Sequence, residues 1–196
     1  MKYALLFLLL LTIAGGAFAQ RTVEGYYITQ ENDSVTVQMK VPAFLLGGIN
    51  FKKLRKGVEA MDSLNGAKPI TPVDVKRIGF VHKNDQYQLV SKPEKGGSLA
   101  FLQPVIVGPK ASLYQYDQEV SSGMNHTTTQ EFYTFERQDG THLFLTNFAS
   151  LSTFKEKLGA FYGSSPEVQQ LINSSFEARR HIQRDIRKVV EAVNKS

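Results

Sequence analysis

The spacing of apolar residues changes once along the chain, near Asn147, and this change limits the possible folds more than any other feature. Before Asn147, apolar and polar residues alternate in short segments. Val35 and Val37 within 34–41 show the two-residue period of a half-buried strand. After Asn147, apolar residues recur three or four positions apart, which predicts helices. This order predicts an α+β fold, in which an antiparallel β-sheet or partly open barrel is followed by C-terminal helices.

The β-rich part, residues 20–147, divides into short segments separated by turn residues. We expect strands at 24–30, 34–41, 49–54, 58–61, 68–71, 77–82, 86–91, 99–107, 111–117, 130–137 and 141–146. Residues 71–74 predict a brief helical turn capped by Thr71, and the polar segment 118–129 predicts a loop. In the last hairpin, Phe132 and Phe144 are candidates for the buried face.

The helical part, residues 148–196, contains two amphipathic patterns and completes a single domain over 20–196. The first helix is predicted over 151–161. A second helical start is predicted at Ser165, because a proline and an acidic residue follow it. The last helix is expected to pack on the sheet through apolar residues at helical spacing, which are Ile182, Ile186, Val189, Val190 and Val193.

The first 19 residues have the pattern of a cleavable signal peptide. Lys2 supplies a positive start, and the apolar run 4–13 is too short to span a bilayer, which needs about 20 apolar residues. Ala17 and Ala19 match the small-residue pattern that signal peptidase accepts, so cleavage is expected to expose Gln20. An uncleaved N-terminal anchor is the alternative. We therefore expect an exported protein, periplasmic or extracellular, that is not an integral membrane protein after cleavage.

Composition excludes several classes of protein. The sequence has no cysteine, which argues against a disulfide-stapled secreted module and against a lipoprotein anchored through cysteine. The formal net charge is +5, and the 23 basic residues are not gathered into a run, so we expect no nucleic-acid partner. Without disulfide bonds, the fold must be held together by packing and hydrogen bonds.

No motif for catalysis, cofactor binding or metal binding is recognisable. The four histidines, His82, His126, His142 and His181, stand outside any zinc-binding spacing and have no metal-ligating neighbours in the sequence. Asp139 can approach His142 across a turn, but an aspartate before glycine already has a turn-forming role there. The nucleophile elbow and the phosphate-binding loops are absent. We assign no catalytic residue, no cofactor and no metal, and leave open whether the protein is an enzyme, favouring a non-enzyme.

Aromatic residues on the predicted strands are the best candidates for ligand contacts. Neighbouring residues of a strand point to opposite faces, so some of these rings can line an apolar groove for a glycan, lipid or peptide. Core packing beneath the C-terminal helices is the alternative interpretation. The candidates are Tyr26, Tyr27, Tyr114, Tyr116 and Tyr133.

The last helix and the residues before it are rich in arginine and lysine. A helix that lies on a membrane surface is one interpretation. Acidic residues at 177, 185 and 191 dilute this charge, so a solvated outer face is the interpretation we favour. The basic residues are Arg179, Arg180, Arg184, Arg187 and Lys188.

Four segments, taken in order, resemble a group of exported proteins. They read GYYITQENDSV, PITPVDVKRIGF, SLYQYDQE and EFYTFERQDGTHLFL, and an amphipathic C-terminal helix follows. The set resembles uncharacterised exported proteins of Bacteroidetes, a resemblance that implies export but no activity, cofactor or catalytic residue. In such a host, Ser34 and Ser63, each between aspartate and an aliphatic residue, are similar to O-glycosylation sites.

These features favour a non-enzymatic periplasmic or secreted binding or structural domain, whose partner is a glycan, a lipid or an envelope protein. One alternative is a periplasmic hydrolase that acts on glycans or esters. Another is an accessory subunit of a cell-envelope complex. A deep pocket with paired carboxylates would favour the hydrolase, whereas a shallow pocket with aromatic residues would favour binding.

Overall fold

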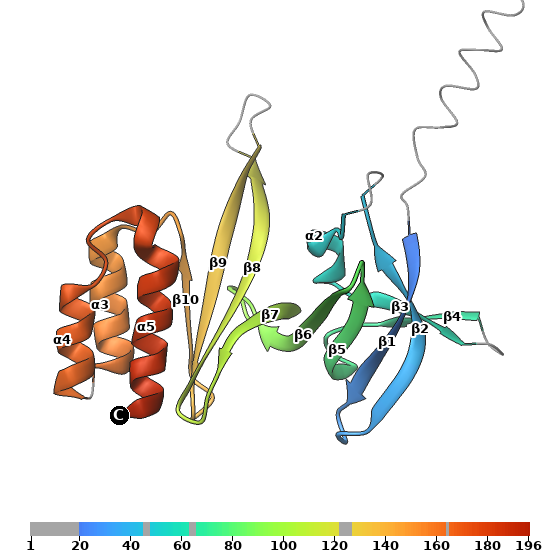
Figure 1. Cartoon of the computed structure of the whole chain (residues 1–196), viewed down its shortest axis with the longest axis horizontal. Helices are drawn as coiled ribbons and strands as arrows, with labels where there is room; N and C mark the ends of the chain where they lie inside the picture. Colours follow the sequence, from blue (N-terminus) through green and yellow to red (C-terminus); the bar gives the residue numbers. More distant parts are fainter. Residues whose placement is uncertain (1–19, 45–47, 63–65, 122–126, 164) are drawn as a thin grey trace, which may run out of the picture.

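The computed structural model of the chain describes residues 20–44, 48–62, 66–121, 127–163 and 165–196. The predicted signal peptide, with Ala17 and Ala19, lies outside the described residues, and so does Ser63. Within the described part, an antiparallel sheet is followed by C-terminal helices, as the sequence predicts, and strand residues outnumber helical ones (Figure 1).

Among the described residues, ten antiparallel strands form one open sheet in the order β10-β9-β8-β7-β6-β5-β1-β2-β3-β4. The strands are β1 (Gln20–Thr29), β2 (Ser34–Pro42), β3 (Val58–Asp62), β4 (Gly66–Ile70), β5 (Val75–His82), β6 (Asp85–Pro93), β7 (Leu99–Val107), β8 (Ala111–Ser121), β9 (Thr127–Arg137) and β10 (His142–Thr146). The helices are α2 (Phe51–Leu54), α3 (Leu151–Tyr162), α4 (Pro166–Ser174), the short 3₁₀ helix η2 (Arg179–His181) and α5 (Ile182–Lys195).

Turn residues set the register of the hairpins. Lys83 and Asn84 both have positive φ, 52° and 68°, so a two-residue turn joins β5 to β6 and pairs His82 with Asp85. Gly140, with φ 78°, allows the tight turn between β9 and β10. Asparagine and glycine tolerate this conformation best, which is why these hairpins are predictable from the sequence.

Two predicted segments differ from the structure. Residues 51–54 are helical instead of extended, because the Asn50 side chain caps this turn by accepting a hydrogen bond from the Lys53 N–H at 3.1 Å. The predicted loop 118–129 is largely strand: β8 continues to Ser121 and β9 begins at Thr127, with regular pairing between them. Threonine favours strands, and this preference outweighs the polar composition there.

Residues 71–74 form a single hydrogen-bonded turn, and its cap differs from the predicted one. The N–H of Asp74 donates to the carbonyl of Thr71 at 3.0 Å. The Asp74 carboxylate accepts from the Thr71 N–H at 2.9 Å and from the Thr71 hydroxyl at 2.6 Å. The aspartate, instead of the threonine, is therefore the accepting side chain.

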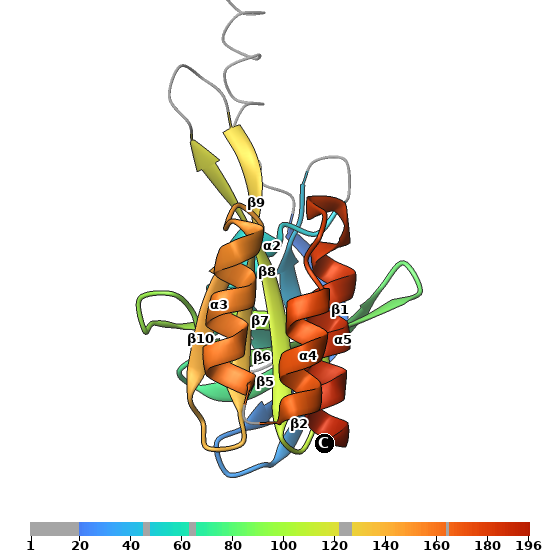
Figure 2. The same cartoon turned by 90° about the vertical axis from the view of Figure 1, so that its left-hand side faces the viewer.

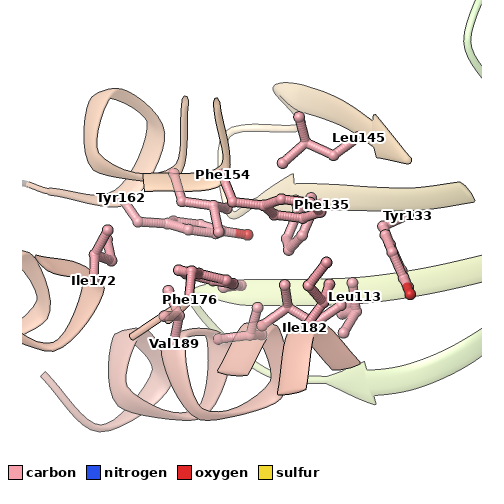
Figure 3. Close-up of a cluster of buried hydrophobic side chains, with 14 of the residues drawn as sticks. Leu113, Tyr133, Phe135, Leu145, Phe154, Tyr162, Ile172, Phe176, Ile182 and Val189 are labelled. Carbon is pink, nitrogen blue, oxygen red and sulfur yellow. The ribbon is translucent and has the colours of Figure 1, made fainter. Parts of the chain in front are cut away.

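The helices cover one face of β7 to β10, where they form the larger core (Figures 2 and 3). Tyr133, Phe135 and Leu145 point to this face, and Phe154 and Phe176 from the helical layer stack at 5.4 Å between ring centres. Phe132 and Phe144 occupy the alternate positions and lie on the other face. The predicted buried face of this hairpin is thus wrong by one residue, which inverts the whole strand.

Helix ends and one asparagine fix the helical layer. The Ser150 hydroxyl caps α3 by accepting from the Thr153 N–H at 3.0 Å. Asn194, near the end of α5, accepts hydrogen bonds from the N–H groups of Lys110 and Ala111 at 3.0 and 2.9 Å. It also donates to the carbonyl of Ala111 at 2.9 Å. The last helix therefore packs on the sheet, as the sequence predicts.

A second core lies where α2 packs against the strands β1 to β7, around Met39, Ile78 and Phe101. The pairing of Gln115 with Gln103 places Leu113 of the larger core and Phe101 of the second core on the same face of the sheet. The opposite face carries a smaller cluster made of Val90, Ala100, Leu102, Tyr114 and Tyr116. One face of the sheet thus carries two separate cores.

Candidate functional site

A hollow of about 440 Å³ opens where β9 and the turn after β10 meet the start of α5. Ligand pockets commonly enclose roughly 300–1,000 Å³. We call this hollow the Phe148 pocket, and it is lined by Glu131, Tyr133, Asn147, Phe148, Arg179, Arg180, Ile182 and Gln183. Three separate segments of the chain contribute to it.

Backbone pairing beyond the end of β10 places the first of these segments. The Asn147 N–H donates to the carbonyl of Glu131 at 3.0 Å, which extends the ladder by one residue. The Asn147 side chain accepts in return from the Glu131 N–H at 3.3 Å. This exchange fixes the turn that holds Phe148 at the rim.

A hydrogen-bond network forms the floor of the pocket. Both carboxylate oxygens of Glu131 accept from the Gln183 amide, at 2.9 and 3.0 Å, and one also accepts from the Tyr133 hydroxyl at 2.5 Å. Burial raises the pKa of Tyr133 far above its usual value, and the hydrogen bond to Glu131 raises it further. The tyrosine therefore remains a protonated donor, and the carboxylate is held in one orientation.

Two arginines form one wall. Arg179 is anchored, because its Nη1 donates to the carbonyl of Asn147 at 3.0 Å. Arg180 donates through Nε to the His181 imidazole at 3.2 Å. Within the part of the chain that the structure describes, no hydrogen bond or ion pair involves the two terminal nitrogens of Arg180, which leaves the planar end of its guanidinium available to a ligand.

These arginines stand at an unfavourable place for helix stability. They lie just before α5, whose N-terminal end carries positive dipole charge, and His181 makes no side-chain cap there. Asp185 in the first turn is acidic, but its carboxylate already accepts from the Phe176 N–H and from Arg184. Residues that lower the local stability of a fold are expected at functional sites, and these arginines fit that pattern.

Phe148 provides an exposed aromatic surface, since its side chain is 55% exposed. Single exposed apolar residues are common and need no special explanation. Phe148, however, shares the rim of a hollow with two arginines and a fixed carboxylate. An apolar ring beside a few oriented polar groups is the usual composition of a small-ligand site.

A second carboxylate lies next to the floor. Asp117 on β8 pairs with Glu131 on β9, so the two side chains share a face. Burial raises the pKa of Asp117, and the charge of Glu131 raises it further. Asp117 lines a smaller hollow of about 80 Å³, where the Arg55 guanidinium covers the Tyr116 ring at 4.6 Å.

The tyrosines named from the sequence do not gather at one site. The Tyr26 ring covers Gly79, where a Cβ atom would come within 2.4 Å of it, and its hydroxyl accepts from Gln88 at 3.2 Å. It lines a separate hollow of about 410 Å³. Tyr27 is half-buried against the second core. Both rings have packing roles in the structure.

The other three tyrosines are buried. Tyr114 donates its hydroxyl to Glu136 at 2.8 Å, and Tyr116 lies beneath Arg55. Tyr133 alone among the five reaches the Phe148 pocket, where its hydroxyl contributes to the floor while its ring belongs to the larger core. Ser34 is exposed at the start of β2, and its glycosylation stays a prediction.

Glu136 is the centre of a polar cluster that the sequence did not reveal. Lys92 Nζ lies 2.6 Å from one carboxylate oxygen, and His142 Nε2 lies 3.5 Å away. Burial alone would raise the pKa of Glu136, but hydrogen bonds from Lys92 and Tyr114 lower it. Lys92 comes from β6 and Glu136 from β9, so this pair ties strands that are not neighbours. We interpret the cluster as structural.

His142 therefore has a carboxylate neighbour in space, and this neighbour is Glu136 instead of Asp139, which accepts a hydrogen bond from the Thr141 N–H within the turn. Burial lowers the pKa of its imidazole, and the positive charge of Lys92 acts in the same direction against the opposing effect of Glu136. The turn at Asp139 and Gly140 fixes the pairing of His142 with Glu136, so the register of this hairpin was the signal that predicts the contact.

The chain matches no protein-family model, no curated protein and no solved structure in comparisons with each. In the described residues, no helix is long and apolar enough to cross a membrane. Those residues also contain no group of three or more histidine, aspartate or glutamate side chains placed to hold a metal ion. The function of the protein is therefore inferred from the geometry of the site.

Proposed function

We propose that this chain is an exported, non-enzymatic binding domain whose ligand enters the Phe148 pocket. The observation that carries the proposal is the combination, around one open hollow, of an exposed ring, an arginine with available donors and a fixed carboxylate. Export is proposed from the signal-peptide pattern of residues 1–19.

The polar groups of the pocket suit binding better than proton transfer. Three hydrogen bonds already engage the Glu131 carboxylate, so it is oriented for recognition. The raised pKa of Tyr133 keeps its proton in place near neutral pH. A general base needs a free approach to the proton that it takes, and the hydrogen bonds to Gln183 and Tyr133 restrict that approach at Glu131.

A glycan array, probed with the mature chain, tests the proposal. Phe148→Ala is expected to lose whatever ligand the wild type retains, because the ring provides the apolar side of the pocket. Phe44→Ala is the matched control, since Phe44 is 53% exposed but lies elsewhere, and it is expected to bind normally. Ligand binding that is unaffected by Phe148→Ala would refute the assignment.

A glycan hydrolase is the second candidate, and the Asp117–Glu131 pair is the observation that favours it. Two neighbouring carboxylates, one with a raised pKa, are the usual groups of glycoside hydrolysis. In this case Asp117→Asn would abolish turnover of the bound glycan but leave its binding intact. Our proposal predicts no turnover in either protein, measured as released reducing ends.

A further inference from the structure

We infer that the ligand of the Phe148 pocket is a saccharide that carries a carboxylate, such as a uronic acid. This inference rests on the proposed binding function and specifies the chemistry of the ligand. It follows from three requirements of the pocket: an acceptor for the available guanidinium, an apolar face for the ring and hydroxyl groups for the floor.

The first requirement comes from Arg180. Its Nε is engaged by His181, so its two terminal nitrogens form the free end of the planar group. A carboxylate matches this spacing with two parallel hydrogen bonds, which a neutral hydroxyl cannot do. Arg179 lies beside it and adds positive charge, while its own position is held by the Asn147 carbonyl.

The second requirement comes from Phe148. Its exposed ring offers a flat apolar surface at the rim. The C–H face of a pyranose ring is flat and weakly polar, and it covers such a surface without burying a hydroxyl group unpaired. A simple inorganic anion fills the arginine site but leaves this ring exposed to water.

The third requirement comes from the floor. The carboxylate of Glu131 has about four acceptor positions, and Gln183 and Tyr133 occupy three of them. The remaining position can accept a hydrogen bond from a hydroxyl group of the ligand. The negative charge of the Glu131 carboxylate repels any anionic group of the ligand beyond the one that Arg180 binds. This excludes ligands that are anionic throughout, such as sulfate or phosphate clusters, and favours one acid group among several hydroxyl groups.

Calorimetric titration with a trimer of galacturonic acid tests the inference, and its methyl ester is the matched neutral ligand. The acid is expected to bind about tenfold to a hundredfold more tightly than the ester, because the ester cannot make the paired charge-assisted hydrogen bonds. Added salt is expected to narrow this difference.

Three variants locate the effect. Arg180→Met is expected to reduce the affinity for the acid to that for the ester, and Arg180→Lys to restore only part of the difference because it lacks the planar fork. Arg77→Met, which removes an exposed charge on β5, is the control for net charge and is expected to bind the acid like the wild type.

Two results overturn the inference in distinguishable ways. Equal affinity for acid and ester, with both lost in Phe148→Ala, removes the acid requirement and leaves the proposed binding function standing. Binding of the acid that survives both Phe148→Ala and Arg180→Met, or no binding of either ligand, removes the pocket assignment for this class of ligand and with it the inference.

Discussion

At the scale of single residues, Gly79 has no side chain and so leaves space on its strand for a neighbouring ring. Tyr26 from the paired strand fills the space, and a Cβ atom on Gly79 would lie 2.4 to 2.7 Å from two atoms of its ring and from its hydroxyl oxygen. Aromatic cover of a strand glycine is a known way to stabilise a sheet. The tyrosine proposed from the sequence as a ligand contact therefore has a packing explanation.

Gly79→Ala is expected to lower the free energy of unfolding by about 1–3 kcal/mol, because the ring must move away. Gly48→Ala is the control: the nearest contact of its new Cβ is at 3.8 Å, so its effect is expected to stay within about 0.5 kcal/mol. Urea denaturation of both variants measures the difference. Equal stability of the two variants would contradict the packing role of Tyr26.

The lowered pKa of Glu136 indicates that the stability of the protein depends on pH. Its pKa is lowered in the folded protein, so the folded state binds its proton less tightly than the unfolded state does. Its contribution to the free energy of unfolding is therefore complete above the pKa of a glutamate in the unfolded chain, about 4.3. This contribution is lost as the pH falls through the lower pKa that Glu136 has in the folded protein. The pKa of His142 is also lowered in the folded protein, so protonation of its imidazole favours the unfolded chain. The resulting loss of stability begins at a higher pH than the loss from Glu136.

Glu136→Gln is expected to cost about 1 kcal/mol at pH 7, a small value because the cluster is partly exposed. The variant is also expected to lose less stability than the wild type between pH 5 and pH 3, measured by urea denaturation at each pH. Glu177→Gln, at an exposed position, is the control and should follow the wild-type curve. If the stability of Glu136→Gln falls with pH in the same way as that of the wild type, the Lys92–Glu136 ion pair contributes nothing to stability.

At the scale of elements, the Asn194 side chain joins α5 to the end of the β7–β8 turn and to the first residue of β8. Asn194 makes two hydrogen bonds as acceptor and one as donor to Lys110 and Ala111, in addition to a bond within the helix. Gly108 permits this approach, since a Cβ atom there would come within 2.3 Å of the Asn194 amide. The attachment is thus specific to asparagine at this position.

Asn194→Ala is expected to destabilise the protein by about 1–3 kcal/mol, because it leaves two backbone donors unsatisfied. Hydrogen exchange should accelerate at the amides of Lys110 and Ala111 and in the last turn of α5. Asn173→Ala, whose side chain makes one long hydrogen bond at 3.4 Å, is the control and should change neither measurement.

The elements also show which sequence signals are sufficient. Hairpins with asparagine or glycine at the turn were predictable because those residues supply positive φ, as at Asn84 and Gly140. The buried face of β9 was not predictable, because aromatic residues occupy both faces of this strand. Only the docked helices decide which face is buried in the larger core. The 51–54 helix escaped prediction because its cap, Asn50, follows a strand-like apolar residue.

The candidate site was less accessible to sequence reasoning than the fold. The sequence marks Tyr133 as an aromatic residue of a strand, and it marks Arg179 and Arg180 as part of a basic segment near the C-terminus. Their meeting depends on α5 docking against β9, which brings together residues about 50 positions apart. Phe148 carries no motif, and only its exposure beside the hollow distinguishes it.

At the scale of the whole molecule, two cores share one sheet, and two ion pairs reinforce the region between them. Arg55 lies 3.1 Å from Glu94, and Lys92 lies 2.6 Å from Glu136. Phe154→Ala in the larger core is expected to cost about 3–5 kcal/mol. If residues 20–196 are a single domain, the helical circular-dichroism signal and tyrosine fluorescence will report one shared unfolding midpoint in this variant. Separate midpoints would mean that the cores unfold independently.

Titration of ¹⁵N-labelled protein with trigalacturonate, followed by two-dimensional NMR, tests whether the Phe148 pocket is the binding site. If the ligand enters this pocket, shift changes will concentrate on Glu131, Asn147, Phe148, Arg180 and Gln183. The amides near Tyr26 and around Glu136 should remain unchanged. Saturable changes confined to those other regions, with the pocket amides unaffected, would contradict this assignment.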